Sequence, residues 1–128
     1  MTREELFRLV SERYGTEPDY PWLDSPEAAV LRHGPGEKWY GLVMRLTRKI
    51  LGLPGGGTID VINLKLDPAL VLILLEQPGF LPAWHMNKKH WITALLDGSV
   101  PDELLGRLVD ESFSLTRKKI KKYDRGEE

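Results

Sequence analysis

The sequence predicts an α+β domain, a two-layer sandwich in which helices cover one face of an antiparallel five-stranded sheet. Three observations lead to this class. Apolar residues recur at helical spacing near both ends of the chain, they alternate with polar residues in the middle, and turn-forming residues separate the segments. The expected order is α-β(3)-α-β(2)-α, and the short connections between neighbouring strands favour antiparallel pairing.

The N-terminal segment has the pattern of a capped helix. Thr2 and Glu5 stand at the spacing of a capping box, in which each side chain accepts a hydrogen bond from the other residue's backbone. The helix should end at Gly15, and residues 16–27, rich in proline and acidic residues, should form an ordered loop. The apolar stripe of this helix is Leu6, Val10 and Tyr14.

Three strands are expected next, over residues 28–33, 38–46 and 59–66, and the first two form a hairpin around the turn at 34–37. Alternation predicts which side chains meet the helices and which lie on a second, open face. The residues expected toward the helices are Tyr40, Leu42, Met44, Leu46, Ile62, Leu64 and Leu66. Those expected on the open face are Trp39, Val43, Arg45, Val61, Asn63 and Lys65.

The second half of the chain predicts a helix, two strands and a helix. Asp67-Pro68 is a capping pair that starts a helix running to about Gln77. Strands are expected over 82–86 and 90–96, around a turn in which Asn87 can adopt a positive φ. The last helix should run from Ser99 or Pro101 to about Lys122, with a core stripe of Leu104, Leu105, Leu108, Val109 and Phe113.

Length and composition indicate one globular domain, residues 1–128, with a charged tail over about 117–128. The net charge of −1 argues against a non-specific nucleic-acid-binding protein, because proteins of that class are usually basic. The charge is unevenly spread, however. Residues 1–29 hold seven acidic residues and three arginines, whereas residues 38–91 hold seven basic residues and three acidic ones. A locally basic face is therefore expected.

The chain has no cysteine, which excludes disulfides, thiolate metal sites and cysteine nucleophiles. The N-terminus lacks the apolar core of a secretion signal. The longest apolar run, residues 69–75, is too short to cross a membrane. We therefore expect a cytoplasmic protein with no membrane partner.

Several short segments together resemble the YjbR/MmcQ family of small bacterial proteins. They are Tyr20-Pro21-Trp22, Arg32-His33, Lys38-Trp39-Tyr40, Asn63-Leu64-Lys65 with Asp67-Pro68, and Pro78-Gly79-Phe80 through His85-Met86-Asn87-Lys88 to His90-Trp91. The resemblance spans about residues 20–113. It implies a CyaY-like, secretion-chaperone-like fold and a DNA-binding role through winged hairpins, the "double wing".

Two groups of residues are candidates for contact with DNA. The first surrounds the turn at 87–89, where lysines can reach phosphates and a tryptophan can stack on a base. The second lies on the expected open sheet face and at the adjoining strand end, as one basic patch. The first group is His85, Asn87, Lys88, Lys89, His90 and Trp91; the second is Trp39, Arg45, Arg48, Lys49 and Lys65.

Each candidate also has a plainer interpretation. The turn at 87–89 can be a solvated turn above buried tryptophans, and the sheet face can be an ordinary polar surface. The glycine-rich segment 52–58 lacks the lysine and following helix of a phosphate loop, so it predicts a strand connection. The histidines lack a third partner for a metal site, and no catalytic constellation stands out. We expect no enzyme, metal or cofactor.

A protein-interaction or chaperone-like module is the alternative to DNA binding. Its partner would dock on the open sheet face or on the apolar run 70–75, which a homodimer could also bury. Burial of that run between the first and last helices is the plainer possibility. The sequence leaves monomer and homodimer open, and a small-ligand site beneath the Tyr20–Trp22 loop is a third option.

Overall fold

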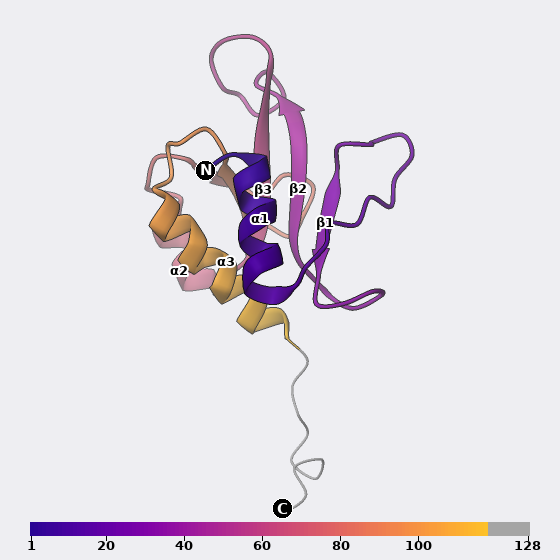
Figure 1. Ribbon diagram of the computed structural model, residues 1–128. Coiled ribbons are helices and arrows are strands. Elements are labelled where there is room, and N and C mark those ends of the chain that lie inside the picture. Colours follow the sequence, from indigo (N-terminus) through magenta and orange to yellow (C-terminus); the bar gives the residue numbers. More distant parts are fainter. Residues whose placement is uncertain (118–128) are drawn as a thin grey trace, which may run out of the picture.

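The computed structural model describes residues 1–117 and confirms the predicted two-layer α+β architecture (Figure 1). Within these residues, five antiparallel strands pair in the order β1-β2-β3-β5-β4, and three helices cover one face of the sheet. The elements are α1 (Arg3–Tyr14), β1 (Ala29–Arg32), β2 (Trp39–Thr47), β3 (Thr58–Lys65), α2 (Pro68–Leu74), β4 (Phe80–Pro82), β5 (Trp91–Leu95) and α3 (Asp102–Thr116).

Side-chain caps start the first two helices as predicted. The Thr2 hydroxyl accepts a hydrogen bond from the Glu5 N–H, and the Glu5 carboxylate accepts one from the Thr2 N–H. Asp67 caps α2 by accepting from the backbone N–H two residues on, and Pro68 occupies the first turn. The predicted end of α2 at Gln77 is wrong, because the helix stops at Leu74 and a turn follows.

The last helix is also shorter than predicted. It ends at Thr116, because Arg117 has an extended backbone, and residues 118–122 of the predicted helix lie outside the described residues. Most of the charged tail expected over 117–128 lies outside them too. The predicted core stripe of α3 does pack on the main core, through Leu104, Leu105, Leu108, Val109 and Phe113.

The main core lies between the helices and the sheet, and buried hydrogen bonds tie α3 to it. Tyr40 is fully buried, and its hydroxyl donates to Thr16 Oγ1 at 2.6 Å. Burial raises the pKa of Tyr40 to about 12. Ser112 donates to the Tyr40 carbonyl oxygen at 2.6 Å and accepts from the Lys65 N–H at 2.9 Å, so one α3 side chain joins β2 and β3.

One residue inserted into β2 changes the predicted facing of that strand. The register with β1 slips by one, so that Leu31 pairs with Gly41 but Arg32 pairs with Trp39. Tyr40 faces the helices as predicted, but the side chains beyond Gly41 are reversed. The predicted facing of Leu42, Met44, Leu46, Val43 and Arg45 is wrong: Val43 joins the main core, while Leu42, Met44 and Leu46 pack on the opposite face.

The second face of the sheet is covered, so the prediction of an open face is wrong. Val61 and Asn63 on this face have no solvent exposure. The cover comes from two connections, the β2–β3 hairpin loop with its glycine-rich segment and the loop at residues 83–90 between β4 and β5. They contribute to a second apolar cluster with Leu51, Leu53, Trp84 and Met86.

The connection between β4 and β5 differs from the predicted hairpin. The strand expected over 82–86 is Phe80–Pro82 instead, and residues 83–90 form an ordered loop. The positive φ expected at Asn87 falls on His85, at 59°. Asn87 instead caps a turn: its side-chain oxygen accepts from the N–H groups of Lys89 and His90, and its carbonyl accepts from Trp91.

The apolar run of α2 is only partly buried. Val71 and Leu74 join the main core, whereas Leu72 and Ile73 are 69% and 61% exposed. Complete burial of this run between the first and last helices is therefore ruled out. The exposed pair forms an apolar spot on the outside of the helical layer.

A substitution at Gly79, just before β4, tests how closely this glycine packs against Ser99 and Val100. Its φ is +90°, and a Cβ there would lie 2.6 Å from Val100 Cγ2 and 2.7 Å from Ser99 Oγ. We expect Gly79→Ala to lower the free energy of unfolding by about 2–3 kcal/mol. Gly56→Ala, with nothing near its Cβ, should change it by less than about 0.5 kcal/mol. Urea unfolding followed by tryptophan fluorescence measures both, and equal effects would contradict this packing.

Candidate nucleic-acid interface

The residues predicted to contact DNA lie at opposite ends of the sheet. Arg45 pairs in register with Asp60, beside the β2–β3 loop that carries Arg48 and Lys49. At the other end, Lys65 pairs with Trp91. Trp39 and Arg45 are six residues apart on β2, a distance of about 20 Å along a strand. The expected single patch of Trp39, Arg45, Arg48, Lys49 and Lys65 is therefore divided in two.

Arg45 is engaged on the helix-covered face. Its Nε donates to Asp60 Oδ1 at 2.9 Å, and this hydrogen bond is the main cause that raises the pKa of Arg45. Arg3 of α1 approaches the same carboxylate oxygen at 3.9 Å and donates a hydrogen bond to the Glu27 carbonyl. The Arg45 guanidinium thus already has a carboxylate partner within the protein, and Arg3 shares that partner.

Lysines gather at the opposite end of the sheet. Trp91 stands directly across from Lys65, and the Leu66 N–H donates to the His90 carbonyl at 2.9 Å, which holds the turn at 87–90 beside the end of β3. Lys88 and Lys89 are exposed on that turn. We call Lys65, Lys88, Lys89, His90 and Trp91 the lysine surface.

The cations of this surface have no carboxylate partner among residues 1–117. Each ion pair in the described part of the chain uses an arginine or the amino terminus, and none uses a lysine. Lysine ammonium groups without internal partners keep their hydration and can exchange it for phosphate contacts. The lysine surface can therefore attract an anionic backbone.

A buried hydrogen-bond network positions the loop that carries this surface. The Thr93 hydroxyl donates to Asn63 Oδ1 at 2.5 Å and accepts from the Trp84 N–H at 3.0 Å. The Asn63 amide donates to the Trp84 carbonyl at 3.0 Å. Asn63 and Thr93 are fully buried. Both backbone groups of Trp84 are satisfied, so the loop is fastened to β3 and β5.

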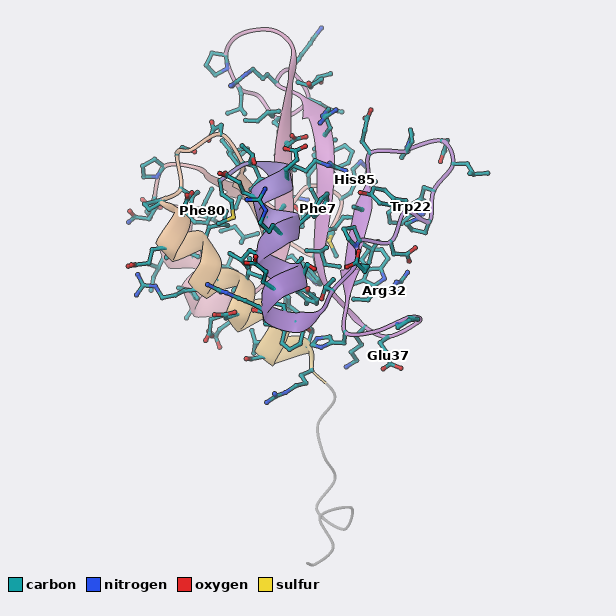
Figure 2. All side chains as sticks on the ribbon, viewed as in Figure 1. Phe7, Trp22, Arg32, Glu37, Phe80 and His85 are labelled. Atoms are coloured by element: carbon teal, nitrogen blue, oxygen red, sulfur yellow. The ribbon has the colours of Figure 1, made fainter. Side chains whose placement is uncertain are left out.

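The aromatic side chains near this end of the sheet pack against neighbouring residues and are only partly exposed to solvent. Trp39, Trp84 and Trp91 are each half-buried, and the Trp84 ring meets His85 edge-on at 3.8 Å. The Trp39 ring contacts two residues outside the predicted set, the Arg32 guanidinium at 5.6 Å and the Trp22 ring at 5.7 Å. Figure 2 shows Arg32 and Trp22 on the same side of the molecule.

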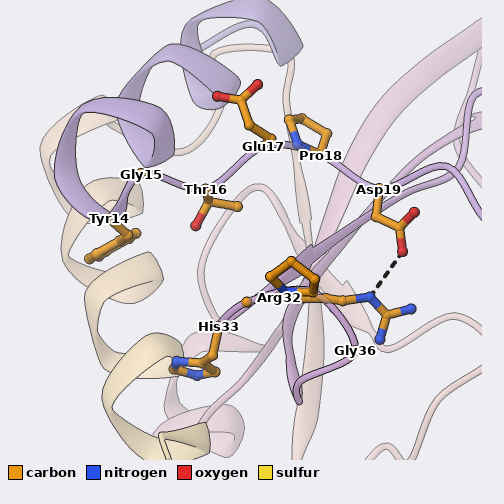
Figure 3. Close-up of a pocket in the computed structure, with 11 residues that line it drawn as sticks. Tyr14, Gly15, Thr16, Glu17, Pro18, Asp19, Arg32, His33 and Gly36 are labelled. Atoms are coloured by element: carbon orange, nitrogen blue, oxygen red, sulfur yellow. Dashed lines mark hydrogen bonds and ion pairs between the residues drawn. The ribbon is translucent and has the colours of Figure 1, made fainter.

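A cleft of about 420 Å³ opens beside β1, lined by residues 14–19 and 32–36 (Figure 3). Asp19 exchanges two backbone hydrogen bonds with Val30 of β1, at 3.0 and 2.7 Å, which fixes the outer wall. Arg32 Nε donates to Asp19 Oδ2 at 2.9 Å across the mouth. Sequence reasoning missed this site, although Arg32-His33 belongs to the segments that carried the family resemblance.

His33 contributes an imidazole ring to the cleft. It packs between Tyr40 and Phe113, with ring centroids at 5.4 and 4.3 Å, and burial lowers its pKa, assisted by the charge of Arg117. Among residues 1–117, no group of three histidine, aspartate or glutamate side chains is placed to hold a metal ion. His33 instead bonds to Thr116 at 2.7 Å.

Comparison with known proteins shows the family. The YjbR family model matches residues 11–115, and the chain belongs to the YjbR family, as its sequence motifs indicated. The Bacillus subtilis protein YyaQ is 44% identical over 117 residues, which cover 91% of this chain and 99% of YyaQ. YbdF of Escherichia coli O157:H7 is 32% identical over 104 residues, covering 80% of this chain and 75% of YbdF.

Solved structures share the fold. A crystal structure of a Pseudomonas syringae protein has a TM-score of 0.88 and 43% identity, covering 91% of this chain and all of that one. A Deinococcus radiodurans protein has a TM-score of 0.69 and 31% identity, and the match covers 98% of this chain and 86% of the Deinococcus chain.

In residues 1–117, none of the helices has the length and apolar character needed to cross a membrane.

Thr93→Val tests the network beneath the lysine surface. The change keeps the side-chain shape but leaves the Trp84 N–H and Asn63 Oδ1 without partners. We expect a loss of about 2–3 kcal/mol in the free energy of unfolding, and faster hydrogen exchange at the Trp84 amide. Thr58→Val, at the exposed start of β3, is the matched control and should leave both nearly unchanged. Slow exchange at Trp84 in Thr93→Val would contradict the role of the network.

Proposed function

We propose that this protein is a non-enzymatic DNA-binding protein that holds the sugar-phosphate backbone on its lysine surface. The observation that carries the proposal is the placement of Lys65, Lys88 and Lys89 at one end of the sheet, without carboxylate partners among residues 1–117 and beside Trp91. Ammonium groups in this state release counterions when they meet phosphates. Trp91 adds a half-buried ring against which a sugar or base can pack.

Overall charge sets the expected strength of binding. The net charge of −1 opposes long-range attraction of DNA, so affinity depends on the local cluster of lysines. Such binding should be weak and should fall steeply with salt concentration. Arg48 and Lys49, at the far end of the sheet, can meet only a strand long enough to cross the domain.

A binding role also agrees with the placement of Ser99, His90 and Asp97, which lie near one another in the sequence and are the residue types of a hydrolytic triad. Ser99 donates to Asp97 Oδ1 at 2.5 Å, but His90 precedes β5 whereas Asp97 and Ser99 follow it. The length of β5 thus separates the histidine from the serine. A nucleophile and its base must be within hydrogen-bond reach, and this arrangement does not place them so.

The double variant Lys88→Ala/Lys89→Ala tests the proposed surface. Removing two phosphate contacts should weaken DNA binding and reduce the slope of log affinity against log salt by about 1.5. Fluorescence anisotropy of labelled single- and double-stranded DNA, titrated at several salt concentrations, measures affinity and slope together.

The matched control is Arg48→Ala/Lys49→Ala, which removes the same charge from the opposite end of the sheet. With a short DNA probe, this control should retain most of the affinity and the slope. Equal losses in the two double variants would mean that overall charge, and not the lysine surface, governs binding. An unchanged affinity in Lys88→Ala/Lys89→Ala would refute the proposed placement.

A second candidate function is a protein contact through α2. The observation that favours it is the exposure of adjacent apolar residues, Leu72 at 69% and Ile73 at 61%, on the outside of the helical layer. The sheet face, the other docking surface considered from the sequence, is covered by its own loops. A partner of this kind would bind with little dependence on salt, because burial of apolar area drives the contact.

Leu72→Glu tests this second candidate with a second copy of the chain as partner. We expect the wild-type protein to self-associate at high concentration and the variant to sediment as a monomer with its far-ultraviolet circular dichroism unchanged. Ile50→Glu, at a site 55% exposed in the β2–β3 loop, is the control and should behave as wild type. Monomeric wild-type protein at all concentrations would exclude self-association through α2.

A further inference from the structure

The cleft beside β1 is built into the fold from both sides. Its inner wall is fixed where Thr16, largely buried, accepts the Tyr40 hydroxyl, and its outer wall is fixed where Asp19 pairs with β1. Gly15, with φ at 68°, turns the chain sharply out of α1 and leaves the space between these anchors. Its volume of about 420 Å³ falls in the range of small-molecule sites (Figure 3).

Hydrogen bonds fix the tautomer of His33, which lines this cleft. The Thr116 hydroxyl donates its proton to the Ser112 carbonyl at 2.7 Å, so it must accept from His33 Nε2 at 2.7 Å. The neutral ring therefore carries its proton on Nε2 and presents Nδ1 as an acceptor. None of the hydrogen bonds among residues 1–117 reaches His33 Nδ1. The His33 side chain is only half-buried, so Nδ1 is free to accept from a donor on a ligand or from a water molecule.

The charges around the cleft balance, which argues against an ionic ligand. Arg32 and Asp19 neutralise each other at the mouth and offer guanidinium N–H donors next to a carboxylate acceptor. The neighbouring groups also divide evenly between the two signs. The carboxylates are Glu17, Asp19 and Glu37, and the cations are Arg32, Lys38 and Arg117. The site favours an uncharged group with both donors and acceptors.

The walls favour a flat group. Tyr14 contributes an aromatic ring that stacks on Phe113 at 4.0 Å, and Pro18 and Pro35 contribute rigid apolar surfaces. A nucleobase combines a planar shape, no charge and alternating donors and acceptors on its edges. Arginine and carboxylate side chains are the groups that read such edges in known complexes.

We propose that this cleft binds a nucleobase, with His33 Nδ1 accepting from the base and the Arg32–Asp19 pair facing its polar edge. The base can belong to a free nucleoside or to an unpaired nucleotide of a bound strand. The second source rests on the proposed DNA-binding function. Arg32 and Trp39 pair at the same end of the sheet as Lys65 and Trp91, so a strand on the lysine surface passes near the cleft.

Nuclear magnetic resonance of the full chain with labelled histidine tests this inference. The His33 ring nitrogens are followed during separate titrations with millimolar nucleosides, an unstructured 12-nucleotide single strand, the matching abasic strand and the duplex. We expect His33 Nδ1 to shift with one or more nucleosides and with the single strand. The abasic strand and the duplex, which present no unpaired base, should leave it unchanged.

The substitution His33→Phe keeps a ring against Phe113 but removes the acceptor, and should weaken nucleoside binding by about fivefold to tenfold. Thr58→Val, outside both the cleft and the lysine surface, is the control and should bind nucleosides as wild type does. A shift with nucleosides but not with the single strand would support a nucleobase site in the cleft. It would overturn the idea that the base belongs to a bound strand. No His33 shift in any titration overturns the inference, while lysine-dependent DNA binding, measured by anisotropy, would leave the proposed function standing.

Discussion

The extra residue that β2 carries opposite β1 decides how the two faces of the sheet are occupied. Gly41 lies where the register slips, and a Cβ there would lie 3.1 Å from Leu31 Cδ1, so a larger residue would press on that side chain. Beyond this point every side chain of β2 is turned to the face opposite the one that simple alternation predicts. Arg45 thereby meets Asp60 beneath α1, and Leu42 and Met44 project away from the helices.

That reversal creates the need for a second cover. Leu42 and Met44, with Val61 of β3, would be a large apolar surface in water if nothing lay over them. The loop at 83–90 supplies much of the cover through Trp84 and Met86. Because this loop also carries the lysines, the packing that buries the second face and the placement of the proposed DNA-binding surface have one cause. A change that loosens the loop should therefore affect both stability and binding.

Local signals in the sequence were enough for the elements and the fold class, but not for the site. The caps at Thr2 and Asp67 and the alternation of β3 depend on neighbours in the chain, and the structure confirms them. The register slip depends on close packing against β1, and the path of residues 83–90 depends on hydrogen bonds to Asn63 and Thr93. Contacts between distant segments leave no periodic trace in the sequence.

The predicted DNA-binding residues are divided between the two ends of the sheet for the same reason, because strand register is set by contacts between distant segments. Arg45 and Lys65 were grouped from their charge and from an assumed common face, whereas register places them at opposite ends. The cleft was also out of reach, since it forms between residues 14–19 and 32–36, which are brought together by the pairing of Asp19 with Val30 and by the ion pair of Arg32 with Asp19. Charge composition could suggest a basic surface, but only the pairing of strands could locate it.

The same pairing of Asp19 with Val30 bears on how the protein behaves when concentrated. β1 is an edge strand, and the bridge occupies its outward-facing hydrogen-bonding groups at mid-strand. The opposite edge, β4, has three residues and ends in Pro82, which lacks an N–H. Neither edge offers a long run of unpaired backbone on which another chain could extend the sheet. The domain is thus protected against strand-by-strand aggregation, and any association between copies should proceed through side chains.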